Sequence, residues 1–295
     1  MFATEDVALA SGRRVRVHLI AGEPGARTVV FCHGAPGSGG FDPDPDATAA
    51  RGVTLIGIDR PGYGGSDPMP ADAWASVDRA ADDVAEVLDQ MGTGPVGLVG
   101  WSAGGRVALA VAARRPDLVS RLAVIATPAP DEHVPWIPPE RAALDLLRDR
   151  PPAMAHEVLA SQLAGLVPTP TALASETLAL AGAGEADNAA LAMPGARERV
   201  IEMLRAAFDQ GTAGLAADIA GYCLRPWGFD IGDVRAKTLV LNGAHDPIAG
   251  PRHGKWWQRH LADARYEQSQ NAGHLLVVPT WARVMSFLAP RSGSA

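Results

Sequence analysis

Cysteine is scarce in this sequence, which limits what can hold the fold together. Only two are present among 295 residues, Cys32 and Cys223, and they lie far apart in the chain. Domains stapled by disulfides carry several cysteines at short spacings, so no disulfide framework is expected and a reducing compartment fits. Each cysteine is predicted to be a small, buried, apolar side chain.

Long apolar runs and basic clusters are also missing. No run of about eighteen apolar residues occurs, and the N-terminal segment lacks the basic start and apolar block of a secretion signal. The net charge is −7, and the lysines and arginines form no cluster, which argues against a nucleic-acid partner. We therefore expect a cytoplasmic protein that binds neither nucleic acid nor a membrane.

Apolar residues are nevertheless plentiful enough for a substantial core. Hydrophobic residues make up 47% of the chain and charged residues 20%, as in ordinary globular proteins. Apolar, β-branched runs predict buried strands at residues 28–32, 53–58, 96–99 and 122–126. Helical periodicity separates them, most clearly over 74–91 and 106–113. After a hairpin over residues 6–20, this alternation predicts an α/β fold: a mostly parallel central sheet with helices on both faces.

The segment 128–229 differs in character from the rest. It shows no convincing strand, only amphipathic helical stretches broken by proline and glycine, and sheet character returns at 237–241 and 265–268. About a hundred residues are too many for a loop in a compact domain. The sequence therefore predicts an all-helical cap at 128–229, inserted into a core domain of residues 1–127 and 230–295.

One short acidic segment invites a different interpretation. Residues 41–47 read FDPDPDA, and we predict an exposed loop there rather than a cation site, because the prolines break any regular spacing of the carboxylates. The histidines show no ligand spacing with a second histidine or cysteine, so no metal is expected either.

The most informative stretch is Gly100-Trp101-Ser102-Ala103-Gly104, which lies between a predicted strand and a predicted helix. A serine held in strained backbone geometry at such a turn, with glycines two positions away on each side, forms a nucleophile elbow. A serine hydroxyl becomes a good nucleophile only beside a base, which in turn needs an orienting carboxylate. Ser102 is therefore the candidate nucleophile.

Two downstream residues are candidates for the base and the acid. Asp246 and His274 each follow a predicted strand, and the carboxyl ends of parallel strands meet at one edge of a sheet. The order serine, acid, histidine is the order expected for this elbow. Two rivals stay open: His245 as the base and Asp131 as the acid.

Five motifs carry a resemblance to a known family. HGAPGS, DRPGYGGSD, GWSAGG, GAHDP and NAGH occur in the order seen in α/β-hydrolase-fold enzymes with a helical cap, and they extend over nearly the whole chain. The resemblance implies that Ser102 attacks an acyl carbon, His274 acts as general base and then acid, and Asp246 holds the imidazole tautomer. It implies an oxyanion hole from the backbone N–H groups of Ala35 and Ala103, and no cofactor. His33 is expected to shape its loop.

The resemblance also narrows the reaction. Serine stands at the elbow where haloalkane dehalogenases and epoxide hydrolases carry aspartate, and the GGSWG signature of proline iminopeptidases is absent, so a peptidase is less favoured. We expect a serine hydrolase of a small, largely apolar ester, lactone or thioester, acting as a monomer or homodimer. C–C bond hydrolysis, perhydrolase, lyase or cyclase chemistry, and a non-catalytic ligand receptor stay open as alternatives.

The expected substrate pocket lies between the cap and the sheet. Trp101, which directly precedes Ser102, is one expected lining residue. Several apolar side chains of the cap are either pocket-lining residues or parts of the cap's own core. These are Trp136, Met154, Met193, Met203, Tyr222 and Trp227.

Overall fold

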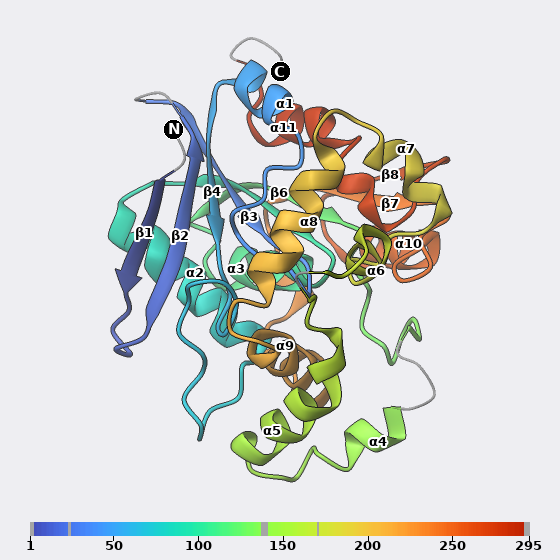
Figure 1. Cartoon of the computed structure of the whole chain (residues 1–295). Coiled ribbons are helices and arrows are strands. Elements are labelled where there is room, and N and C mark those ends of the chain that lie inside the picture. The colour runs from blue at the N-terminus through green and yellow to red at the C-terminus, as the bar shows by residue number, and fades with distance from the viewer. Residues whose placement is uncertain (1–2, 23–24, 137–140, 170, 292–295) are drawn as a thin grey trace.

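A central sheet of eight strands organises the molecule, in the order β1-β2-β4-β3-β5-β6-β7-β8 (Figure 1). The computed structural model describes residues 3–22, 25–136, 141–169 and 171–291. The strands are β1 (Ala3–Ala8), β2 (Arg14–Ala21), β3 (Arg27–Cys32), β4 (Val53–Ile58), β5 (Val96–Trp101), β6 (Val119–Ile125), β7 (Lys237–Gly243) and β8 (Ala264–Ser269). The pairs β1–β2 and β2–β4 are antiparallel and the other five pairs are parallel, so the mostly parallel sheet predicted from the sequence is confirmed.

Helices cover both faces of the sheet. One face packs against α2 (Val77–Met91), α3 (Ala103–Arg114) and α10 (Pro251–His260), and the other against α1 (Pro45–Arg51) and α11 (Trp281–Leu288). Strand β3 shows why. Val30 packs in the apolar cluster on the face covered by α2, α3 and α10, and its neighbour Phe31 packs in the apolar cluster on the face covered by α11. Successive strand side chains point to opposite faces, so continuous apolar strands require cover on both sides.

The order of strands creates the place where a site can form. After β3 the chain adds β4 on one side and then crosses over to add β5 on the other side. The loops at the carboxyl ends of β3 and β5 therefore diverge at a topological switch point, where open α/β sheets bind ligands.

The segment between β6 and β7 contains helices and no strand in its described residues, 126–136, 141–169 and 171–236. Its α-helices are α4 (Arg141–Asp145), α5 (Pro152–Leu163), α6 (Ala174–Ala179), α7 (Asn188–Leu191), α8 (Ala196–Ala207) and α9 (Ala213–Leu224). Helices α5 and α9 build a small core of their own, whereas α8 packs its apolar side against the apolar cluster on the sheet. Figure 1 shows α8 lying across the sheet and α4, α5 and α9 gathered beyond one end of it.

The prediction of an exposed loop at residues 41–47 was right for the exposure of Pro45 and Asp46, but wrong for the buried residues before them and for the helix that begins at Pro45. Phe41 and Asp42 are buried, with 2% and 6% of their surfaces exposed. Asp44 then caps α1, since its Oδ1 accepts a hydrogen bond from the Ala47 N–H at 3.1 Å. An aspartate N-cap followed by proline at the first helical position is a favourable helix start, and this local signal outweighs the turn-forming character of the prolines.

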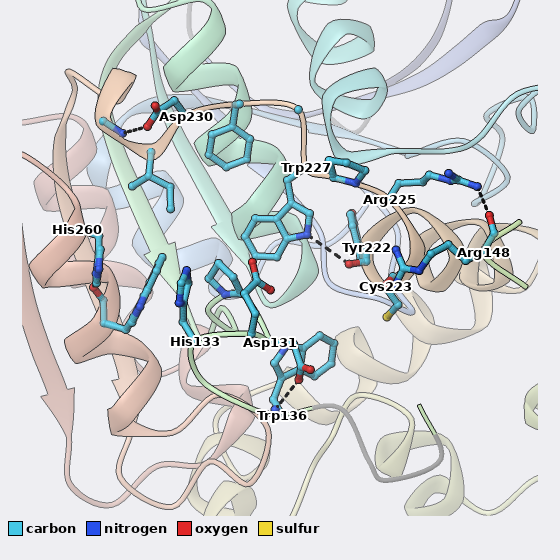
Figure 2. A pocket seen from close by; sticks show the side chains of 18 residues that line it. Asp131, His133, Trp136, Arg148, Tyr222, Cys223, Arg225, Trp227, Asp230 and His260 are labelled. Atoms are coloured by element: carbon cyan, nitrogen blue, oxygen red, sulfur yellow. Dashed lines mark hydrogen bonds between the residues drawn. The ribbon is translucent and has the colours of Figure 1, made fainter. Parts of the chain in front are cut away.

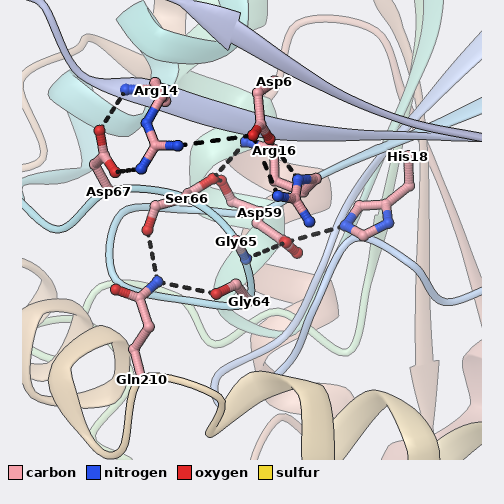
Figure 3. A network of polar contacts seen from close by, with 10 residues as sticks. All are labelled: Asp6, Arg14, Arg16, His18, Asp59, Gly64, Gly65, Ser66, Asp67 and Gln210. Atoms are coloured by element: carbon pink, nitrogen blue, oxygen red, sulfur yellow. Dashed lines mark hydrogen bonds and ion pairs between the residues drawn. The ribbon is translucent and has the colours of Figure 1, made fainter.

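The turn after β4 is held by one buried carboxylate, Asp59. It accepts hydrogen bonds from the N–H groups of Gly39 at 2.6 Å and Gly65 at 3.2 Å. Gln210, from the turn between α8 and α9, donates to the carbonyl oxygens of Gly64 at 2.9 Å and Ser66 at 2.7 Å, as Figure 3 shows. These contacts tie the helical segment to the sheet edge that carries the site.

Candidate active site

Ser102 lies at the turn between β5 and α3, and its backbone is strained. Its φ of 55° and ψ of −123° fall outside the regions that side-chain-bearing residues prefer. The flanking glycines make this turn possible, because a Cβ on Gly100 would overlap the Gly104 carbonyl and a Cβ on Gly104 would overlap the Cys32 carbonyl. Strand and helix therefore approach more closely than any larger residue would allow.

The structure brings Ser102, His274 and Asp246 together in one hydrogen-bonded chain. The serine Oγ lies 3.0 Å from His274 Nε2, and His274 Nδ1 lies 2.9 Å from Asp246 Oδ2. The other carboxylate oxygen, Oδ1, accepts from the N–H groups of Ile248 at 2.8 Å and Ala249 at 2.9 Å. All three side chains are buried, with 9%, 3% and 7% exposure respectively.

These contacts set the ionisation of Asp246 and the tautomer of His274. Burial alone would raise the pKa of Asp246, but the imidazole and the two backbone N–H groups outweigh it and hold that pKa below the ordinary 3.8. A carboxylate can only accept hydrogen bonds, so His274 Nδ1 must carry the proton. Its Nε2 is then free to accept the proton of the serine hydroxyl.

Ala35 and Ala103 lie beside the serine at the ends of two neighbouring strands, and both line the same cavity as Ser102. Ala103 is the first residue of α3, so its N–H has no intrahelical acceptor. The loop that carries Ala35 passes close to the elbow, since a Cβ on Gly34 would lie 3.5 Å from the Ser102 Cβ. Their assignment as oxyanion donors stays a prediction.

The cavity that contains Ser102 has a volume of about 220 Å³. Trp101, Trp136 and Tyr222 line it, as the sequence analysis expected, together with further apolar side chains such as Leu215. Trp101 also anchors the histidine loop, because its Nε1 donates to the His274 carbonyl at 3.0 Å.

Trp227 does not line this cavity, which corrects its expected place there. Its Nε1 donates to the Tyr222 carbonyl at 3.3 Å, and its ring stacks on Trp257. Two methionines pack against the sheet cluster instead, and a third is 48% exposed: Met193, Met203 and Met154.

A second, larger cavity of about 1020 Å³, whose lining Figure 2 shows, shares Trp136 and Tyr222 with the small cavity. Its wall includes Asp131, which accepts a hydrogen bond from the Trp136 N–H at 2.9 Å. Asp131 is therefore not the partner of His274, whose Nδ1 is hydrogen-bonded to Asp246 instead. His245 is exposed and lines neither cavity, so the structure removes it as a rival base.

A buried ion pair that sequence reasoning missed supports the loop before Ala35. Arg60 pairs with Asp218 of α9 at 2.6 Å and donates to the Gly34 carbonyl at 2.8 Å. Burial lowers the pKa of His33 well below 6.5, so its ring is neutral. The neutral ring accepts from the Arg60 N–H at 3.1 Å and donates to Gly34 at 2.7 Å, which is a structural role, as predicted.

Asp187 is a second residue that the sequence analysis missed. It is buried in the helical segment between β6 and β7, and it accepts from the Leu275 N–H at 2.9 Å and the Gly184 N–H at 3.1 Å. Because Leu275 follows His274 directly, this contact positions the histidine loop. Only a long-range contact reveals it, since the local sequence shows an ordinary acidic residue.

Neither a metal-binding cluster nor a membrane-spanning helix is found among the described residues. No group of three or more histidine, cysteine, aspartate or glutamate side chains there is arranged to hold a metal ion. Among the same residues, no helix combines the length and the apolar composition that crossing a bilayer requires.

Comparisons with known proteins agree with this architecture. A 2-hydroxy-6-oxononadienedioate/2-hydroxy-6-oxononatrienedioate hydrolase of Burkholderia vietnamiensis is 37% identical over 42% of this chain and 45% of its own, so the match spans under half of that relative. A pimeloyl-acyl-carrier-protein methyl ester esterase of Nitrosomonas europaea is 26% identical over 83% of this chain and 88% of its own. The esterase structure from Thermogutta terrifontis superposes with a TM-score of 0.68 at 22% identity, covering 97% of this chain and 96% of that one.

A family model for the alpha/beta hydrolase fold matches residues 27–279. That range includes the elbow, the loop after β3, and the two strand ends that carry Asp246 and His274. The protein therefore belongs to the alpha/beta hydrolase fold family, and the relatives described above are themselves hydrolases.

Proposed function

We propose that this protein is a serine hydrolase that cleaves a small ester, lactone or thioester through an acyl-enzyme intermediate. The observation that carries the proposal is the hydrogen-bonded chain from Ser102 through His274 to Asp246, which opens into a cavity of mainly apolar walls. A buried serine beside a base of fixed tautomer is arranged for nucleophilic attack. The proposal includes residues 128–229 as a cap over the core.

The proposed reaction proceeds in two halves. Ser102 Oγ attacks the acyl carbon while His274 Nε2 takes its proton, and the ionised Asp246 stabilises the imidazolium that forms. The N–H groups of Ala35 and Ala103 stabilise the oxyanion. The imidazolium then gives the proton to the departing alcohol or thiol. A water molecule repeats the sequence on the acyl-enzyme and releases the acid.

The cavity and one relative indicate the kind of substrate. About 220 Å³ is less than drug-sized ligands occupy, so the bound acyl group is small. The Nitrosomonas relative, which matches most of this chain, is named as a methyl ester esterase. C–C bond hydrolysis is the second candidate, because the Burkholderia relative is named for a dienedioate hydrolase.

Hydrolysis of p-nitrophenyl esters from acetate to decanoate tests the proposal. We expect turnover with a short-chain optimum, because the cavity beside Ser102 is small. Ser102→Ala should lower kcat at least ~1000-fold, because the three residues act as a unit. Ser161→Ala, an exposed serine on α5, is the matched control and should keep full activity.

Equal turnover by Ser102→Ala and the natural protein would overturn the acyl-enzyme mechanism. If no ester is cleaved, cleavage of a vinylogous 1,5-diketone tests the second candidate. Stoichiometric binding of such compounds without any product would instead support the receptor alternative. The cytoplasmic location and the monomeric or homodimeric state stay predictions, the latter to be measured by sedimentation velocity.

A further inference from the structure

Arg106 is a buried cation with no direct ion-pair partner among the residues that the structure describes. It lies on α3, one helical turn after Ser102, with 1% of its surface exposed, and its side chain lines the small cavity. Among the described residues it has no hydrogen-bond or ion-pair partner, and its Nε is buried and unsatisfied. An unpaired buried charge is costly, so its presence in the cavity wall needs an explanation.

The nearby carboxylates are committed elsewhere. Asp218 lines the same cavity, but both of its oxygens bind Arg60, at 2.6 Å and 3.3 Å, and one also accepts from the Tyr63 hydroxyl at 2.9 Å. Asp131 acts on Arg106 only through space and lies in the wall of the larger cavity. Asp218 is therefore paired with Arg60, and no carboxylate among the described residues pairs directly with the guanidinium of Arg106.

Two more unsatisfied hydrogen-bonding groups lie beside this charge. Trp136 Nε1 and Tyr222 Oη are buried without a partner at hydrogen-bond distance, although the Tyr222 hydroxyl lies near the Asp218 carboxylate, and both residues line the same cavity as Arg106. The guanidinium carbon of Arg106 is 4.7 Å from the Trp136 ring centroid and 5.1 Å from that of Tyr222. The guanidinium of Arg106 and the indole of Trp136 can only donate hydrogen bonds, and the phenol of Tyr222 can donate one. These three groups therefore suit a hydrogen-bond acceptor that carries a negative charge.

We propose that Arg106, with Trp136 and Tyr222, forms a subsite that binds a carboxylate of the substrate. The inference rests on the proposed hydrolase function and narrows its substrate class to esters or lactones whose acyl part ends in an anionic group. Ser102 and Arg106 both line the cavity of about 220 Å³, so the chain between the scissile carbonyl and the carboxylate must be short, and two to four methylene groups are the range to test.

A purely structural role for Arg106 makes a different prediction. The guanidinium carbon of Arg106 also lies 4.7 Å from the centroid of the Trp227 ring. The rings of Trp136, Tyr222 and Trp227, which Figure 2 labels, therefore all contact this guanidinium. If stacking were its only role, losing the charge would affect anionic and neutral substrates alike. Discrimination between matched substrates separates the two roles.

The test compares the hydrolysis of monoethyl succinate, glutarate and adipate with that of ethyl butanoate, pentanoate and hexanoate, which have the same numbers of acyl carbons. Hydrolysis is measured as the release of ethanol. The natural protein should prefer the anionic ester of the best-fitting pair by at least ~10-fold in kcat/KM. Arg106→Met should reduce this preference by about 10- to 100-fold, the range that a hydrogen-bonded charge pair supplies. Arg106→Lys should keep part of the preference.

Arg114→Met is the matched control, because Arg114 is on the same helix but exposed, where it pairs with Asp82. It should keep the preference unchanged. No preference in the natural protein at any chain length would overturn the carboxylate subsite. So would a preference that Arg106→Met leaves within about threefold of its original value.

A binding measurement separates failure of the subsite from failure of the hydrolase function. In the Ser102→Ala protein, the best-fitting of succinate, glutarate and adipate should raise Tm, and adding Arg106→Met should abolish that rise. If no ester is hydrolysed but this Tm shift is found, the subsite stands and the hydrolase function fails. If neutral esters are hydrolysed and no dicarboxylate shifts Tm, the hydrolase function stands and the subsite fails.

Discussion

Asp246→Asn tests how the carboxylate controls the histidine, because the surroundings leave the new amide one orientation. Oδ1 accepts from two backbone N–H groups, those of Ile248 and Ala249 at 2.8 and 2.9 Å. An amide nitrogen cannot accept these bonds, so the Asn oxygen must stay there and its NH₂ must face His274. His274 Nδ1 then becomes the acceptor, and the ring proton moves to Nε2.

The consequence for catalysis follows from that tautomer. With a proton on Nε2, His274 can no longer accept the proton of Ser102, although the heavy atoms stay in place. The same change in a Ser-His-Asp site lowers kcat by about 10⁴, which corresponds to about 5 kcal/mol of transition-state stabilisation. Stopped-flow and steady-state hydrolysis of p-nitrophenyl butanoate at pH 7 would measure the loss.

Two measurements make this prediction refutable. The free energy of unfolding in urea should change little, because every hydrogen-bonding group around residue 246 keeps a partner. Asp131→Asn, the same substitution at the rival acid, should keep its activity. A kcat for Asp246→Asn within tenfold of the natural protein would refute the reasoning from the tautomer.

Two further predictions concern stability. Gly104→Ala should lower the free energy of unfolding by about 1–3 kcal/mol because its Cβ would overlap the Cys32 carbonyl, whereas Gly165→Ala enters open space and should be neutral; urea unfolding that shows equal stability for both would contradict the close approach. His253 accepts the Ala129 N–H at 3.0 Å, and burial lowers its pKa from 6.5 to about 4, so its stabilising contribution is complete above pH 6.5 and is lost as pH falls toward 4. His253→Gln should remove this component, so the stability difference between the two proteins should shrink by roughly 2 kcal/mol between pH 7 and 4, allowing for solvent screening. A difference that does not vary with pH would show that His253 is not the titrating group.

The fold and the main candidate residues followed from local patterns. Apolar β-branched runs predicted the parallel strands, and the glycines around Ser102 predicted the sharp turn that its φ of 55° shows. Parallel strands place their carboxyl ends together, which is why Asp246 and His274 could be proposed as its partners before any distance was known. Patterns of this kind are readable because each depends on a few neighbouring residues.

Local patterns failed where burial depended on distant partners. The motif FDPDPDA does not reveal that the Phe41 ring packs 6.0 Å from the Phe31 ring, centroid to centroid, or that Asp44 caps a helix. Arg60 and Asp218 are 158 positions apart, and neither stands in a pattern that predicts the other.

By itself, the sequence determined the fold class, the elbow and the order of the three residues that meet there. Backbone propensity and side-chain period act over one turn or one strand, so they can be read from the chain. The tertiary structure decided the cavity and its charge, because these depend on how the helices between β6 and β7 pack over the sheet. Within the described part of the chain, that packing leaves Arg106 without a direct partner one turn from Ser102, which no property of the residue alone could have shown.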